Sequence, residues 1–481
     1  MRLQPVLSVL GFLLVSVGVL MLTALPVSLC YGDATAQPIV FSSLITIVVG
    51  LLLWLKYRRG GDELRAREGF AIVTLGWVVA SLFGSLPFLL SGAIPSFTDA
   101  YFETVSGFTT TGATVLTNTE DLPRGLLFWR SLTQWIGGMG IIVLSVAILP
   151  LLGVGGMQLF KAEAPGLTVD KLTPRISETA KVLWGVYVLF TAAETGLLWY
   201  GGMPLFDAVC HSFSTLATGG FSTQTASIAS YNSPFLEYVI IVFMFLAATS
   251  FTLHFRALRG SVSAHLRDDE FLFFLAIVLG CTALVAFFIP SEIAGSVEAR
   301  FRASLFQVVS IVTTTGFVTA DYELWLPGAQ VLLLLLMFIG GCAGSTGGGM
   351  KNVRILLLLR NGVVEIKKLV HPKVVLPVRF NGRGVSTDII SEILAFLGLY
   401  VAIFVLASVF VAATGLDVLS SAGAVAATLG NVGPGFGSVG AVDNYAHISG
   451  IAKWILSFCM LAGRLEVFTV LVLFSATFWK R

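Results

Sequence analysis

Charged side chains are scarce in this chain of 481 residues. Asp, Glu, Lys and Arg together make up 12% of it, whereas hydrophobic residues make up 56%. A soluble domain typically carries about 25% charged residues, so this composition excludes one and predicts a polytopic membrane protein. The formal net charge is only +2, which provides no strongly basic surface, and no nucleic-acid partner is expected.

Cysteine is also rare, and the five cysteines are scattered and odd in number. They predict neither a disulfide framework nor a metal site. Residues 344–351 resemble a phosphate-binding loop, but Met350 separates the last glycine from Lys351 and no strand precedes the segment, so the Walker pattern fails. The cytoplasmic loops hold no Ser/His/Asp constellation, and we do not expect an enzyme.

Long apolar runs are abundant instead. Each is near the ~20 residues that a bilayer requires, and the first is interpreted as a retained helix rather than a signal peptide. The ten expected spans lie at residues 5–30, 38–55, 69–91, 126–152, 180–200, 235–257, 270–290, 327–360 (interrupted), 388–414 and 450–479. Four shorter segments, at residues 97–109, 204–216, 299–313 and 418–429, are interpreted as re-entrant pore helices.

A turn of Thr and Gly follows each short helix. The turns read TTTGA at 109–113, LATGGF at 216–221, TTTGF at 313–317 and GNVGPG at 430–435. We align Gly112, Gly219, Gly316 and Gly433 with one another. One such turn is an ordinary loop, but four in register predict an all-α membrane protein with four pseudo-symmetric membrane–pore-loop–membrane repeats around one pore.

These turns suit a dehydrated monovalent cation. Glycine permits unusual backbone angles and close approach, so four turns around one axis can present rings of carbonyl oxygens that replace an ion's water. Each preceding helix also points its negative C-terminal end at the same place. The sequence therefore predicts a selectivity filter.

The expected organisation adds an N-terminal helix pair to the fourfold core, because the first two spans have no pore helix. The expected boundaries are residues 1–60 for the pair, then 69–157, 180–262, 268–384 (with an interrupted second helix) and 388–481 for the four repeats.

Lys and Arg residues set the expected orientation. Of the 29, 23 fall on one side of the spans, five on the other and one, Arg464, within a span. Both termini should therefore be cytoplasmic, and the turns should enter from outside. Carboxylates near the turns either attract cations to the mouth or belong to ordinary solvated loops; they are Glu120, Asp121, Asp321, Glu323 and Asp443.

The eighth span is interrupted by a glycine-rich stretch at residues 340–349. Glycine disfavours helix, and irregular backbone at membrane depth survives only inside protein or beside a watery cavity. We therefore expect a gate just inside the filter, held by Arg464. Alternatively, Arg464 pairs with Glu466 or another carboxylate as a structural strut. The expected gate residues are Gly344, Ser345, Thr346, Gly347, Gly348, Gly349 and Arg464.

The largest cytoplasmic segment, at about residues 360–386, is basic. It could contact anionic membrane lipid or dock a cytosolic partner. Alternatively, these basic residues serve only to keep the segment on the cytoplasmic side of the membrane.

Several motifs together resemble one family. They are FTTTGAT at 108–114, QWIGGMG at 134–140, LPLLGVGGM at 149–157, ATGGFS at 217–222, FIGGCAGSTGGG at 338–349 and GRLEVF at 463–468. They are similar to those of the TrkH subunits of bacterial Trk potassium uptake systems, within the superfamily of Trk, Ktr and plant HKT transporters. The extra N-terminal pair favours TrkH over the shorter Ktr subunit.

The resemblance implies potassium uptake across the bacterial inner membrane, by a homodimer with two separate pores. It implies a cytosolic ring of TrkA-type subunits that binds ATP, ADP or NAD(H), so that this chain itself carries no cofactor. It also implies that K+ binds at the filter, at Thr110, Thr111, Gly112, Thr218, Gly219, Thr314, Thr315, Gly316, Asn431, Val432 and Gly433.

A proton- or sodium-coupled potassium symporter remains an alternative. Coupling normally requires an ionisable residue at a cavity within the membrane. The candidates are Glu103, Glu194, Asp207, His211 and Glu466. Glu103 and Asp207 lie near the starts of pore helices, where a carboxylate also suits the helix dipole.

Overall fold

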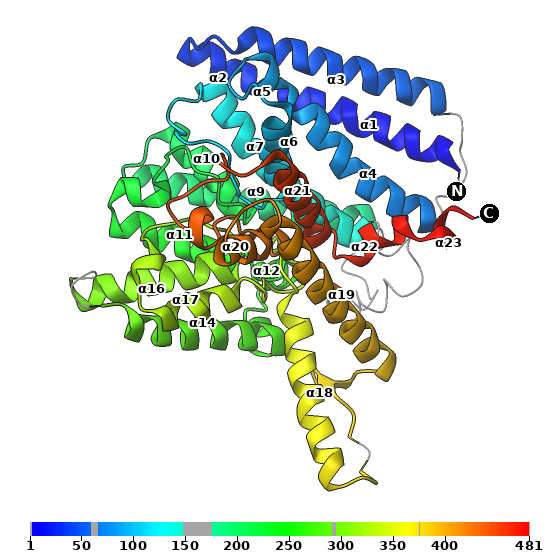
Figure 1. Ribbon diagram of the computed structural model, residues 1–481, viewed down its shortest axis with the longest axis vertical. Helices are drawn as coiled ribbons and strands as arrows, with labels where there is room; N and C mark the ends of the chain where they lie inside the picture. Colours follow the sequence, from blue (N-terminus) through cyan, green and yellow to red (C-terminus); the bar gives the residue numbers. More distant parts are fainter. Residues whose placement is uncertain (1, 59–65, 148–175, 291–294, 375, 481) are drawn as a thin grey trace.

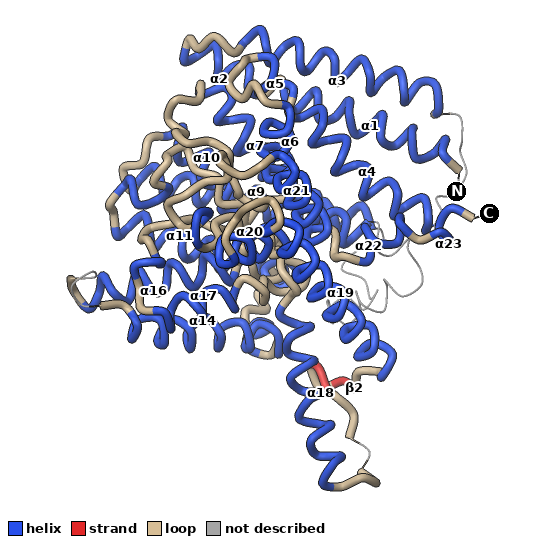
Figure 2. The backbone as a smooth tube through the Cα atoms, in the orientation of Figure 1, coloured by secondary structure: helices blue, strands red, loops and turns tan. Residues whose placement is uncertain are grey.

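The computed structural model describes residues 2–58, 66–147, 176–290, 295–374 and 376–480. In these ranges the regular secondary structure is helical except for one hairpin, β1 (Arg379–Phe380) with β2 (Arg383–Gly384), and loops connect the helices (Figures 1 and 2). Among the described residues, six helices are long and apolar enough to cross a membrane, or up to eight if two bent helix pairs each count as one span. The predicted all-α, multi-pass membrane fold is confirmed.

The N-terminal pair comprises α1 (Leu3–Met21), α2 (Ala24–Tyr31) and α3 (Ala36–Tyr57). In Figure 1, α1 and α3 run side by side at one edge of the molecule. Glycines allow this contact, because a Cβ on Gly11 would lie 2.7 Å from the Gly50 oxygen, and a Cβ on Gly50 2.7 Å from the Gly11 oxygen. Close backbone approach through small residues is typical of helices packed in membranes.

Four sets of helices follow. The first is α4 (Ala66–Gly84), α5 (Leu86–Leu90), α6 (Phe97–Phe108) and α7 (Arg124–Ala147). The second is α9 (Ile176–Tyr200), α10 (Leu205–Leu216), η1 (Ser227–Tyr231), α11 (Pro234–Ala247), α12 (Phe251–Leu258) and α13 (Ser263–Leu266). The third is α14 (Asp269–Phe288), α16 (Val297–Val312), η2 (Tyr322–Leu324), α17 (Pro327–Leu336), α18 (Asn352–Val370) and the hairpin. The fourth is α19 (Thr387–Ala412), α20 (Val418–Leu429), η3 (Gly437–Val439), α21 (Gly450–Arg464), α22 (Phe468–Leu471), η4 (Val472–Phe474) and α23 (Ala476–Trp479).

The four predicted short helices are present as α6, α10, α16 and α20. Three have side-chain caps at their first turn: Ser96 accepts from the Asp99 N–H, Ser296 from the Ala299 N–H, and Asp417 from the Leu419 and Ser420 N–H groups. Such caps satisfy backbone donors that a helix start leaves unpaired. Sequence thus sets where these helices begin, and the turns set where they end.

Two expected spans are not continuous, which corrects the sequence prediction. The span expected at 235–257 bends by 102° between α11 and α12, and the span expected at 450–479 bends by 114° after α21. At the first bend the glycine-rich loop inserts: Cys342 N–H donates to the Ala248 oxygen at 2.8 Å, and Phe251 N–H to the Gly344 oxygen at 3.1 Å. Local composition gave no sign of the first break, because the groups that replace its helical hydrogen bonds come from another repeat.

The predicted interruption of the eighth span is confirmed, since α17 ends at Leu336 and α18 begins at Asn352. Beyond it, α18 projects from the body beside α19 (Figure 1). Asp269 holds the base of this projection through Arg360 Nη1 at 2.7 Å. The family motif at 149–157, most of the basic cluster between residues 161 and 181, and the end of the span expected at 126–152 lie outside the described residues.

Candidate cation-selectivity site

All four pore helices end in the same hydrogen-bonded turn. In the first, Thr110 N–H bonds to the Gly107 oxygen at 3.0 Å and Thr111 N–H to the Ser106 oxygen at 2.9 Å. The same pair of bonds closes the other three helices, from Thr218 and Gly219, from Thr314 and Thr315, and from Asn431 and Val432. This is the Schellman arrangement, which places one residue in the left-handed region.

The left-handed residue is threonine in three turns and asparagine in the fourth. The φ values are 52° at Thr110, 53° at Thr218, 60° at Thr314 and 56° at Asn431. A β-branched residue is a genuine outlier there, and such outliers cluster at functional sites, where surrounding structure holds them. Asparagine tolerates this conformation better, so the degenerate fourth turn keeps the same backbone with another residue type.

A glycine follows two residues later in each turn, and these glycines link the four turns into a closed ring. Their φ values are 85° at Gly112, 75° at Gly220, 83° at Gly316 and 99° at Gly433. A Cβ on each would meet a carbonyl oxygen of the next turn: Gly112 meets Gly219 at 2.2 Å, Gly220 meets Thr315 at 2.0 Å, Gly316 meets Val432 at 1.9 Å, and Gly433 meets Thr111 at 2.6 Å. Only glycine allows this backbone-to-backbone contact.

The ring corrects the sequence alignment of the second turn. Gly220, not Gly219, has the positive φ and the ring contact that Gly112 has. Gly219 instead matches Thr111, Thr315 and Val432, and its oxygen takes part in the ring. Two adjacent glycines in the second turn made the sequence alignment ambiguous by one residue.

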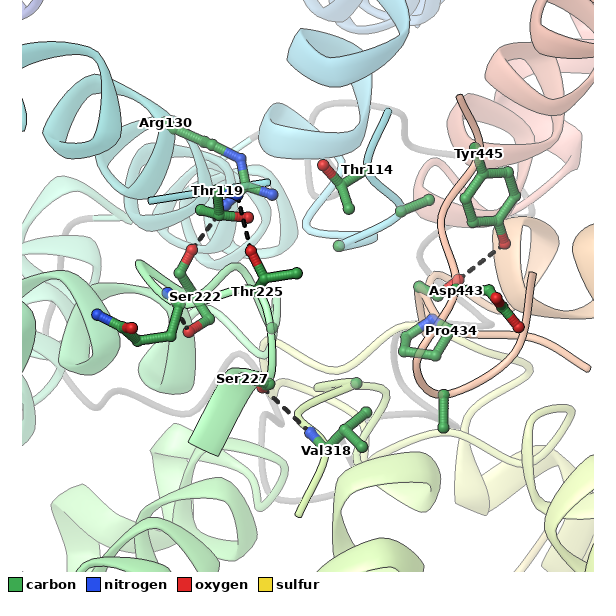
Figure 3. A pocket seen from close by; sticks show the side chains of 17 residues that line it. Thr114, Thr119, Arg130, Ser222, Thr225, Ser227, Val318, Pro434, Asp443 and Tyr445 are labelled. Carbon is green, nitrogen blue, oxygen red and sulfur yellow. Dashed lines mark hydrogen bonds between the residues drawn. The ribbon is translucent and has the colours of Figure 1, made fainter. Parts of the chain in front are cut away.

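A cavity of about 70 Å³ lies on the side of the ring where the turns continue into the outer loops. All four ring glycines line it. Thr114, Ser222, Val318 and Pro434, from the four segments that follow the turns (the exit segments), also line it and lie around a common centre in Figure 3. A single water requires roughly 10–15 Å³ of such space. The cavity therefore has room for a partly hydrated cation above the ring.

Of the five carboxylates expected near the mouth, one lines this cavity, Asp443. Glu120 is hydrogen-bonded to the N–H and hydroxyl of Thr225, and Glu323 accepts from the Gly437 N–H at 2.6 Å. Burial raises the pKa of Glu323, and the charges of Asp321 and Asp443 act in the same direction. These three acids therefore lie near enough to one another to repel.

In the first three turns, the side chain seven positions before the left-handed residue connects the pore helix to its exit segment. Glu103 accepts from Thr114 Oγ1 at 2.9 Å and pairs with Arg130 at 2.7 Å. His211 Nε2 lies 2.9 Å from Ser222 Oγ. Gln307 Nε2 donates to Thr319 Oγ1 at 3.4 Å. Glu103, His211 and Gln307 thus occupy equivalent structural positions.

The glycine-rich loop lies directly against the other side of the turns. Gly348 N–H donates to Thr314 Oγ1 at 2.6 Å, and Thr346 Oγ1 donates to the Leu216 oxygen at 2.9 Å. A Cβ on Gly348 would lie 2.7 Å from the Gly430 oxygen. The loop therefore contacts the second, third and fourth turns from the side opposite the cavity.

Arg464 binds this loop rather than a carboxylate. Its Nη1 donates to the Thr346 oxygen at 2.6 Å and its Nη2 to the Gly137 oxygen at 3.4 Å. The alternative partner, Glu466, accepts instead from Arg354 Nη2 at 2.8 Å. The strut between Arg464 and Glu466 is therefore wrong.

Sequence reasoning missed the other charges around the loop. Lys351 and Arg354 count among the 23 basic residues on the side expected to be cytoplasmic, yet they are only 7% and 2% exposed. Lys351 Nζ donates to the Gly347 oxygen, and Glu270 accepts from both the Ala343 and Val353 N–H groups, at 2.8 and 3.1 Å. Lys351 and Arg354 lie three positions apart, directly after the glycines. This spacing places two side chains on one face of a helix, and it is the sequence signal that could have indicated that both face the loop.

The remaining coupling candidates differ in their partners. Asp207 accepts from Thr223 Oγ1 at 2.7 Å. Glu194, on α9, is fully buried; among the residues that the structure describes, Thr215 interacts with its carboxyl group, and no Lys or Arg pairs with it.

Comparisons with known proteins agree with this architecture. A sequence model of the TrkH family, described as cation transport protein, matches residues 35–481. The chain is 45% identical to the Trk system potassium uptake protein TrkH of Salmonella typhimurium, over 100% of both chains. It is 38% identical to the Trk system potassium uptake protein TrkG of Escherichia coli, over 98% of this chain and 97% of that protein.

The crystal structure of the potassium transporter TrkH from Vibrio parahaemolyticus superposes with a TM-score of 0.91, at 42% identity and over 100% of both chains. Matching sequence, length and fold leave one conclusion. The chain is a member of the TrkH family of cation transport proteins.

Proposed function

We propose that this chain takes up potassium across the bacterial inner membrane through a selectivity filter and a gated pore. The observation that carries the proposal is the closed ring, in which each of four glycines contacts a carbonyl oxygen of the next turn. Four backbone segments held this closely around one axis suit coordination of a dehydrated monovalent cation by oxygen. The relatives that are 45% and 38% identical are named potassium uptake proteins, which supports potassium as that cation.

The filter in this proposal consists of the predicted residues, with Gly220 added to them. The loop at residues 344–349 is the gate, and Arg464 holds it closed. Its contacts support this assignment, because the loop touches three of the four turns. A guanidinium bonded to the loop places positive charge beside the ion path, which raises the barrier for a cation.

The finer organisation is also proposed. The repeats have the boundaries 69–157, 180–262, 268–384 and 388–481, preceded by the pair at 1–60. Both termini face the cytoplasm: Arg2 bonds to Glu68 at 2.8 Å, and the adjacent Arg67 bonds to the Lys480 oxygen at 2.7 Å, which supports their lying on one side. The chain forms a homodimer, and a cytosolic TrkA-type ring that binds ATP, ADP or NAD(H) moves the loop.

The test is uptake of potassium or rubidium by a potassium-auxotrophic cell, with and without the cytosolic partner. The proposal predicts growth at low potassium and uptake that depends on the partner. A chain that reaches the membrane, together with its partner, and restores no uptake would contradict it.

A proton- or sodium-coupled symporter is the second candidate, and Glu194 favours it. A fully buried carboxyl group whose contacts among the described residues include Thr215 but no cationic partner is expensive to retain unless it serves a function. Reversal potentials of the purified protein in a bilayer decide the matter, because coupling to protons shifts them with a pH gradient. In that case Glu194→Gln removes the shift, whereas an unshifted parent excludes proton coupling.

A further inference from the structure

The second turn differs from the other three in what keeps its backbone in place. Thr111, Thr315 and Val432 precede the ring glycine in the first, third and fourth turns, and their β-branched side chains restrict the backbone. Gly219 precedes Gly220 in the second. The peptide between two glycines has the greatest freedom to rotate, so this turn alone has little intrinsic preference for the ring geometry.

Hydroxyl pairs further fix two of the other turns. Thr109 and Thr111 hydroxyls lie 2.8 Å apart, and so do those of Thr313 and Thr315. The equivalent residues of the second turn, Ala217 and Gly219, have no hydroxyl. Whatever fixes the second turn must therefore come from outside it.

Gln134, fully buried on α7, supplies the missing contacts. Its Nε2 donates to the Gly219 oxygen at 2.6 Å, and its Oε1 accepts from the Phe221 N–H at 3.1 Å. These two groups belong to the peptide units on either side of Gly220. One side-chain amide thus holds both peptides of the ring glycine, including the one between two glycines.

The space around Gly219 fits the same explanation. Its φ is outside the positive range, so its backbone does not require glycine. A Cβ there would lie 2.4 Å from Gln134 Cδ, 2.6 Å from Oε1 and 2.7 Å from Nε2. Gly219 is therefore glycine because Gln134 occupies the space that a side chain fills in the other turns.

We propose that Gln134 is a positioning residue for cation selectivity, which orients the 219–220 peptide so that the Gly219 carbonyl completes the ring. This inference rests on the proposed potassium filter. It assigns to α7, outside the Thr-Gly turns, a part in selecting potassium over sodium. Loss of the amide lets the 219–220 peptide rotate and removes one of the four ring oxygens from its place.

The experiment measures the potassium-to-sodium permeability ratio of the purified full-length protein from reversal potentials in planar bilayers. We expect Gln134→Ala to lower the ratio roughly tenfold, which corresponds to about 1.4 kcal/mol. Gln134→Glu keeps the size of the side chain but removes the donor to Gly219, and we expect a similar loss. If the alanine variant does not fold, Gln134→Glu alone provides the test.

Two further variants separate positioning from general stability. Gln330→Ala is the matched control, because Gln330 donates to the oxygens of Glu323 and Trp325 in an outer loop away from the ring; it should leave the ratio unchanged. Gly219→Ala should impair selectivity in the parent, since it displaces Gln134. The double variant Gln134→Ala with Gly219→Ala should instead be more selective than Gln134→Ala alone. The alanine at 219 fills the space that Gln134 leaves, and it removes one of the two adjacent glycines.

The outcomes are distinct. A parent that does not prefer potassium overturns the proposed function and this inference together. A selective parent whose folded Gln134→Ala or Gln134→Glu variant keeps the ratio within about twofold overturns the role of Gln134 alone. An equal loss in Gln330→Ala also overturns it, because the effect is then one of stability.

Discussion

Arg464 donates a hydrogen bond to the carbonyl oxygen of Thr346 at 2.6 Å, which joins the second helix of the fourth repeat to the glycine-rich loop of the third. The guanidinium is 3% exposed, and its second contact is the Gly137 oxygen on α7. Three repeats thus meet at one side chain. A loop held in this way can move only when a buried, charge-assisted hydrogen bond is broken.

Removing that bond should open the pore. Arg464→Ala should raise potassium flux without nucleotide by roughly tenfold or more, because hydrogen bonds to charged groups contribute about 1.5–3 kcal/mol. Shortening the loop by several glycines should act in the same direction. Flux is measured in proteoliposomes, with Arg360→Ala as a control at the surface pair with Asp269. If both variants reach the membrane, fold and keep the low basal flux of the parent, neither element is the gate.

The ring glycines should not tolerate a side chain. Alanine at Gly112, Gly220, Gly316 or Gly433 should reduce potassium selectivity, because a Cβ overlaps a carbonyl of the next turn and a positive φ costs about 1–2 kcal/mol. Gly398→Ala, on α19 where a Cβ meets nothing within 4 Å, is the matched control. Unchanged selectivity in all four variants would refute the filter assignment. The second glycine does not make the second turn tolerant, because a Cβ on Gly219 would overlap Gln134 and a Cβ on Gly220 would overlap the Thr315 oxygen.

The ion pair of Arg354 with Glu466 should stabilise the inner side of the loop. Arg354→Met should lower the thermal midpoint of the purified protein, because breaking a buried pair costs about 3–5 kcal/mol, less here since the Glu466 side chain is 35% exposed. The double variant with Glu466→Gln should recover most of the loss. Lys368→Met, at the exposed pair with Glu365, should be nearly neutral. A double variant no better than Arg354→Met would show that the pair is not coupled.

Asp443 should concentrate cations at the outer cavity. Asp443→Asn should lower inward potassium conductance by roughly twofold at ~10 mM ionic strength, the effect expected of one charge about 8 Å from the ion in water. At ~1 M salt the Debye length falls to about 3 Å, and the difference should vanish. Asp388→Asn, at the first turn of α19, is the control. A loss that persists at high salt would point to a structural role instead.

The basic part of α18 and the segment after it should contact the regulatory ring. Reversing Lys367, Lys368 and Lys373 to glutamate should weaken co-purification with the ring without unfolding the membrane part, because α18 projects from the body and carries these charges outside the packed core (Figure 1). Lys56→Glu, at the end of α3, is the control. If the variant retains the partner fully and responds normally to nucleotide, the basic residues of this segment serve only to set the orientation of the chain in the membrane.

Sequence alone determined the elements of this protein. Apolar runs indicated most of the helices, and the Thr-Gly turns indicated the ring, because both depend on residues adjacent in the chain. The break at residues 340–349 was also local, since glycine disfavours helix wherever it is concentrated. The fourth turn was also found, because Gly433 aligns with the glycines of the other turns and a short helix precedes it.

Only the tertiary structure decided which residue of the second turn belongs to the ring and which groups pair with the buried charges. It assigned the ring position to Gly220 rather than Gly219, because a neighbouring turn, not the local sequence, excludes a Cβ there. It bent α11 into α12 where another repeat supplied hydrogen bonds. Arg464 and Thr346 are 118 positions apart, and Arg354 and Glu466 are 112 apart. A buried charge binds whichever partner the folded chain brings to it, and short-range sequence patterns do not contain that information.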